Sequence, residues 1–152
     1  FFTYYIDQYP AIMYIYPIGI MGMAMITAMA MGSTWGTIIL LTPLVSFLHD
    51  PFYVKLAFGA LISGALSGNH ASLFGDSVLI ASSSVGLKLQ YFHDLFMQQI
   101  IPSIVASFAT YGVLSLIYTL YGVESVLIHM IIALVIWFLC MMGAQKWYGC
   151  KK

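Results

Sequence analysis

Apolar residues fill most of this chain, and polar residues interrupt them at a few short points. The first apolar stretch, from Pro10 to Leu48, is broken by GSTWGT at 32–37. A membrane-spanning helix needs about 20 residues, whereas the piece after this interruption would form a helix of only about 16 Å. We therefore predict a re-entrant helical hairpin at 10–48 with both ends on one side of a membrane. Two tight spans joined by a turn at 32–37 are the alternative.

A second interruption lies inside another apolar stretch, SGALSGNHASLFGDSVLIASSS at 63–84. Here glycines stand beside an amide, a carboxylate and several hydroxyls, a mixture typical of a discontinuous transmembrane helix. Non-helical backbone at membrane depth is tolerated only where protein or a water-filled cavity covers it. We predict one broken helix at 55–86, with a first half from Lys55 to Ser67 and a second half from Ser77 to Val85.

The last third of the chain predicts two full spans, at 95–120 and 125–147, after a polar loop at 87–94. This topology places Lys55 on one side of the membrane and the other four lysines on the opposite side. Because cytoplasmic loops carry the excess of basic residues, the C-terminus is expected in the cytoplasm. We expect the plasma (inner) membrane as the location.

Composition strengthens the membrane interpretation. The 152 residues are 62% hydrophobic and 7% charged, with a mean hydropathy of +0.96, whereas soluble domains carry about 25% charged residues. The sequence therefore predicts a single all-α integral membrane domain over 1–152, in contact with membrane lipid. The formal net charge is zero, which gives no electrostatic basis for binding nucleic acid.

The chain contains one predicted hairpin and one predicted broken helix, and no internal repeat. Transporters with discontinuous helices build their site between two inverted repeats, and polar breaks that face lipid are costly. We therefore expect a missing transporter half, either upstream in a longer precursor or as a separate subunit. A homodimer stays open as the assembly.

The polar residues of the second interruption suggest a cation site. Asp76 has the only full negative charge there, and an intramembrane carboxylate indicates function by default. We predict sodium bound by Asp76, Asn69 and Ser77, because half-helix ends and neutral oxygens bind such cations. Ser72 is a further oxygen ligand. Alternatively, Asp76 caps the second half-helix, and Asn69 and Ser72 satisfy unpaired backbone groups.

The remaining candidates are a histidine and the hydroxyls of the hairpin tip. His70 is a candidate proton relay, or a neutral histidine bonded to a backbone carbonyl. Ser33, Thr34 and Thr37 are expected either to contact the ion or substrate or to cap the tip. No resident cofactor is expected, since sodium and protons would be cargo.

The two interruptions together resemble motifs of the NhaC-type sodium/proton antiporters. GSTWGT at 32–37 is similar to that family's Gly-Thr-Ser-Trp-Gly-Thr, with Ser33 and Thr34 exchanged. The second stretch is similar to a family stretch of the form SGAxFGDHxSPISDTTxxSS. It agrees at Ser63, Gly64, Ala65, Gly68, His70, Ser72, Asp76 and Ser82. The resemblance implies the C-terminal part of an antiporter built from inverted hairpin-plus-broken-helix repeats.

This chain also departs from the family pattern. Asn69 stands where the family stretch has Asp, Leu73 where it has Pro, and Gly75 where it has Ser. One carboxylate is lost, which leaves proton coupling open. The predicted function is sodium (or other monovalent cation)/proton antiport by alternating access, not an enzyme activity. The alternatives are a sodium-coupled organic acid exchanger and a non-transporting membrane subunit.

Overall fold

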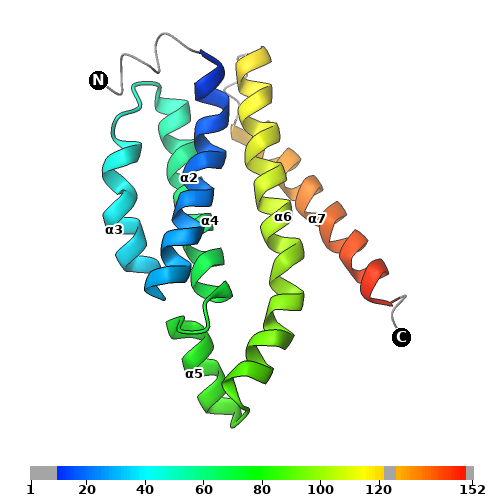
Figure 1. Cartoon of the computed structure of the whole chain (residues 1–152). Helices are drawn as coiled ribbons and strands as arrows, with labels where there is room; N and C mark the ends of the chain where they lie inside the picture. The colour runs from blue at the N-terminus through cyan, green and yellow to red at the C-terminus, as the bar shows by residue number, and fades with distance from the viewer. Residues whose placement is uncertain (1–9, 122–125, 150–152) are drawn as a thin grey trace.

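The structure, a computed structural model, describes residues 10–121 and 126–149. Every regular element in these two ranges is a helix, which confirms the all-α prediction for this part of the chain. Figure 1 shows how the helices are arranged. They are α2 (Pro10–Met31), α3 (Thr34–Val45), α4 (Pro51–Ala71), α5 (Asp76–Val85), α6 (Leu89–Tyr121) and α7 (Val126–Gly149).

Helices α2 and α3 form an antiparallel helical hairpin (Figure 1). Its tip is only Gly32 and Ser33, shorter than the predicted 32–37, because α3 already begins at Thr34. Gly32 has a φ of 65°, a left-handed conformation that favours glycine and lets the chain reverse in two residues. At the open end, the Tyr16 hydroxyl donates a 2.7 Å hydrogen bond to the Leu44 carbonyl and holds the two helices together.

Helix α4 packs closely along α2. A Cβ atom added at Gly64 or Gly68 would collide with the backbone carbonyl of Met21 or Met25 on α2. These glycines therefore let the two helix backbones approach, as small residues do at membrane helix interfaces. The core at the open end of the hairpin is made of buried apolar residues from α2, the α3 region and α4: Ile20, Ala24, Leu41, Val45, Leu48, Tyr53, Ala57 and Leu61.

The broken helix exists, but the break lies later than predicted. Helix α4 continues beyond Ser67 to Ala71, and only residues 72–75 separate it from α5. The predicted end at Ser67 was wrong because Gly68 serves helix packing against Met25, not chain reversal. Asn69 is therefore a helical residue in the last turn of α4.

The polar segment at 87–94 is mostly helix, which corrects the predicted loop. Gly86 has a φ of 71° and ends α5, and α6 begins at Leu89 after a short link. Helix α6 covers the predicted span at 95–120, and α7 covers the predicted 125–147 apart from residue 125, which lies outside the described ranges.

One helix of the described residues is long and apolar enough to cross a membrane. This stretch is Ile100–Leu120 of α6, with a mean hydropathy of 1.9. Shorter apolar stretches occupy 15–31 on α2, 34–45 on α3 and 130–140 on α7. Length and composition thus agree with a membrane span in α6.

Candidate functional site at the hairpin tip and the helix break

The tip of the α2–α3 hairpin contacts the break between α4 and α5. The Ser72 hydroxyl donates a 2.9 Å hydrogen bond to the Met29 carbonyl, and the Asp76 amide donates one of 3.3 Å to the Gly32 carbonyl. A Cβ atom added at Gly32 would lie 2.6 Å from the Phe74 carbonyl oxygen, so the tip lies directly against the break. Two interruptions about 40 residues apart in sequence therefore form one polar region.

Two oxygen atoms of this region are buried without a hydrogen-bond partner among the described residues. They are Oδ1 of Asn69, whose residue is 6% exposed, and Oγ of Ser77. A Cβ atom at Gly75 would lie 2.7 Å from the Asn69 Oδ1 atom, so any larger residue at this position would crowd that oxygen. Buried polar atoms are nearly always bonded, and each exception calls for an explanation. The two unpaired oxygens belong to residues on either side of the break, and oxygen atoms are the ligands that hard cations take.

Asp76 brings a negative charge to the same break. It is the first residue of α5, and its side chain is exposed on this chain. The residue before it, Gly75, is the N-cap of α5, and the Asp76 amide donates to the Gly32 carbonyl. The structure therefore shows no side-chain cap at the start of α5. The position still favours a carboxylate, because the first turn of a helix attracts negative charge.

The other predicted hydroxyls already have bonds inside the protein. Ser72 bonds to the Met29 carbonyl and accepts a hydrogen bond of 3.2 Å from the Phe74 amide. Ser33 is the N-cap of α3 and accepts one of 3.4 Å from the Gly36 amide. The buried Thr37 hydroxyl donates to the Ser33 carbonyl over 2.9 Å. In this structure Ser33, Ser72 and Thr37 are therefore bonded to backbone groups, as the capping alternative expects.

Thr34 and His70 lie at the edges of the region. Thr34 is the first residue of α3, next to the tip. The Nδ1 atom of His70 lies 2.7 Å from the Leu66 carbonyl, and its ring stacks on Phe96 of α6 with centroids 5.6 Å apart. His70 therefore has a backbone carbonyl partner, as expected if it is not a proton relay.

His93 contacts the residue before the break, although the sequence alone predicted a loop at this position. It lies on α6, and its Nε2 atom is 3.0 Å from the carbonyl of Ala71, the last residue of α4. The histidine thereby satisfies a carbonyl that has no partner within its own helix. The apolar positions Leu89, Phe92 and Phe96 have helical spacing and could have revealed this helix in advance.

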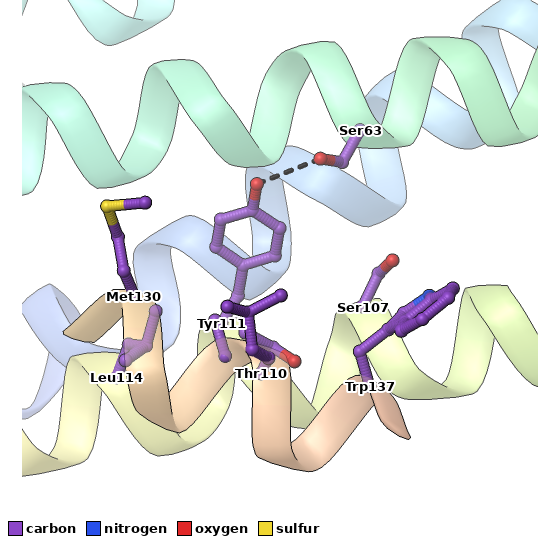
Figure 2. Close-up of a pocket in the computed structure, with 9 residues that line it drawn as sticks. Ser63, Ser107, Thr110, Tyr111, Leu114, Met130 and Trp137 are labelled. Carbon is purple, nitrogen blue, oxygen red and sulfur yellow. Dashed lines mark hydrogen bonds between the residues drawn. The ribbon is translucent and has the colours of Figure 1, made fainter. Parts of the chain in front are cut away.

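A separate hollow of about 400 Å³ lies between α4, α6 and α7. Figure 2 shows Tyr111 of α6 pointing toward α4, where its hydroxyl is 2.8 Å from the hydroxyl of Ser63. Met130 and Trp137 of α7 line the other side (Figure 2). This hollow does not include any of the predicted site residues.

Comparisons of the chain with protein-family models, with curated proteins and with solved structures found no match. The geometry of the break and the composition of the chain are therefore the basis for assigning a function.

Proposed function

We propose that this chain is one half of a membrane transporter that exchanges sodium, or another monovalent cation, for protons. The observation that carries the proposal is that Asn69 and Ser77 have buried, unpaired oxygens and stand on either side of the break at which Asp76 begins α5. The resemblance of the two motifs to NhaC-type antiporters supports the same assignment. We place the chain in the plasma (inner) membrane with its C-terminus in the cytoplasm.

In this proposal, α6 and α7 span the bilayer and the α2–α3 hairpin is re-entrant. The apolar stretch Ile100–Leu120 supports the span, and the 12-residue length of α3 supports the hairpin. A helix of 12 residues is about 18 Å long, too short for a hydrocarbon core of about 30 Å. The tip and the break would then meet at mid-membrane depth, where transporters place their ion sites.

The sodium ligands would be Asp76, Asn69 and Ser77. A hard cation takes oxygen ligands, and the C-terminal end of α4 adds partial negative charge at the same break. Asp76 is exposed on this chain, so its remaining surroundings would come from the missing half, which covers the polar break. Ser72, Ser33, Thr34 and Thr37 would shape the site, and His70 would be a secondary candidate for proton transfer.

Exchange would follow from competition at one carboxylate. Asp76 holds either a sodium ion or a proton, because the two positive charges compete for the same negative group. Alternating access of the loaded site to the two sides of the membrane would then couple the two fluxes. No resident cofactor is needed for this mechanism.

The proposal is tested by proton-gradient dissipation in proteoliposomes that contain the native assembly. Sodium, lithium and potassium are added in turn, with Asp76→Asn as the inactive variant and the exposed Asp94→Asn as the matched control. We expect a sodium-triggered signal that Asp76→Asn loses and Asp94→Asn keeps. The absence of a signal with every cation, from a folded assembly, would favour organic-acid exchange or a non-transporting subunit instead.

A further inference from the structure

We propose that the hollow between α4, α6 and α7 holds the acyl chain of a resident membrane lipid. This inference rests on the proposed membrane location of α6 and α7, but not on cation transport. The lining contains four hydroxyl-bearing residues, so the sequence alone would suggest a polar pocket. The structure instead indicates an apolar pocket, because these hydroxyls are already bonded within the protein.

Each of the four hydroxyls has a partner inside the protein. Ser63 and Tyr111 bond to each other over 2.8 Å (Figure 2). The Ser107 hydroxyl donates to the Ser103 carbonyl over 2.9 Å, and that of Thr110 to the Ala106 carbonyl over 2.8 Å. Among the residues that the structure describes, none in the lining is charged. The hollow therefore offers a ligand mostly carbon surface, which suits a chain that needs no polar partner.

The backbone of α4 makes room for the Tyr111–Ser63 bond. A Cβ atom at Gly59 would lie 3.1 Å from the Tyr111 hydroxyl oxygen, so the ring rests against a helix surface without a side chain. Tyr111 thus joins α6 to α4 and forms the inner wall of the hollow (Figure 2). Side chains of α7 line the opposite side of the hollow, which we call its mouth.

The position of the hollow along α6 points to its occupant. Its α6 residues run from Ser107 to Leu114, the middle of the apolar stretch Ile100–Leu120. In a bilayer this depth contains hydrocarbon chains. A second apolar hollow of about 350 Å³ lies on α7 and shares Leu134 and Trp137 with the first.

Retention of a brominated lipid next to Trp137 tests the proposal. The test protein carries Trp35→Phe and Trp147→Phe, so that Trp137 is its sole tryptophan. It is reconstituted into vesicles of phosphatidylcholine whose acyl chains carry bromine at their middle. It is then transferred into detergent, which exchanges loosely bound lipid. We expect quenching of Trp137 to persist after transfer, and native mass spectrometry to detect a retained phosphatidylcholine.

Two filling variants and one matched control make this measurement decisive. Ala133→Phe fills the hollow from α7 and Ser107→Leu fills it from α6, whereas Ile131→Phe adds the same ring at a position that is 61% exposed and outside both hollows. Retention should fall about tenfold in each filling variant that folds and should be unchanged in Ile131→Phe.

Equal loss of quenching from all variants would overturn the proposal, as would retention that survives both filling variants. Concentration-dependent cross-linking of Trp137 to a second copy would overturn it too, since a protein would then cover the mouth. Asp76→Asn should retain the lipid while losing transport. A failure of the lipid proposal is thereby separated from a failure of the transport proposal.

Discussion

The two ends of α4 differ in how their polar groups are satisfied. At the N-terminal end, Asp50 caps the helix by accepting a 2.8 Å hydrogen bond from the Phe52 amide. The Tyr118 hydroxyl donates to the same carboxylate over 3.2 Å, and the Tyr118 ring stacks on Phe52 with centroids 3.8 Å apart. At the C-terminal end, Asn69 retains a buried oxygen without a partner.

In the proposed transporter, this difference separates stability from ion binding along one helix. The N-terminal end combines a cap, a side-chain hydrogen bond and aromatic stacking, each of which favours folding. The C-terminal end leaves polar atoms unpaired, which lowers stability. Proteins keep such unpaired atoms at sites where the atoms bind a ligand. Variants at the two ends should therefore act on different measurements.

The largest effect is expected at Gly75. In Gly75→Ala the new Cβ atom would collide with the Asn69 backbone carbonyl and crowd its Oδ1, so the break cannot keep its geometry. Cation-triggered proton flux should be abolished, as measured in proteoliposomes. Gly22→Ala on α2 is the control, because no atom lies within 4 Å of its added Cβ. Normal transport by Gly75→Ala would contradict the assigned site.

A large effect on stability alone is expected at Asp50. Asp50→Ala removes the N-cap of α4 and leaves the Tyr118 hydroxyl without this acceptor. The free energy of unfolding should fall by about 1–2 kcal/mol, while sodium affinity stays unchanged. Thermal unfolding in detergent and a sodium titration measure the two quantities. A weaker sodium affinity in this variant would remove the distinction between the two ends.

The opposite pattern is expected at Asn69. Asn69→Leu replaces a buried, unpaired amide oxygen with an apolar side chain of similar size. Stability should rise by about 1 kcal/mol, and sodium affinity should fall about tenfold. Ser72→Ala is the contrasting variant, since it removes two existing hydrogen bonds and should lower stability. A loss of stability in Asn69→Leu would show that the amide has a structural role.

The smallest effect is expected at His93. His93→Phe loses the bond to the Ala71 carbonyl, at a cost of about 1 kcal/mol or less. Hydrogen exchange should accelerate in the last turn of α4 and not at its start. His93→Gln keeps a donor and should restore much of the protection. Uniform exchange along α4 in His93→Phe would mean that this bond does not hold the break.

Long apolar helices and their interruptions could be predicted from the sequence, because their signal is local. The hairpin and the broken helix follow from GSTWGT and from the polar stretch around Asp76. The exact break could not be predicted, because Gly68 looks like a helix breaker until α2 is seen against it. A glycine for packing and a glycine for reversal are identical in sequence.

The residues at the helix break could be predicted from the sequence, but their hydrogen bonds could not. Asn69, Ser77 and Asp76 do lie at the break, yet only three-dimensional contacts separate the unpaired oxygens from the bonded Ser72. The link from His93 to Ala71 crosses 22 residues, and no local pattern reports such a contact. The bonded hydroxyls around Tyr111 were equally invisible, since their partners are backbone carbonyls and Ser63.

The most direct test of the central claim is a titration of sodium affinity against pH on the native assembly. If sodium and a proton compete for Asp76, sodium affinity should fall as the proton concentration rises, because a bound proton excludes the sodium ion from that carboxylate. Asp76→Asn should lose both the affinity and its pH dependence. A sodium affinity that does not change with the proton concentration, or that survives in Asp76→Asn, would contradict the account.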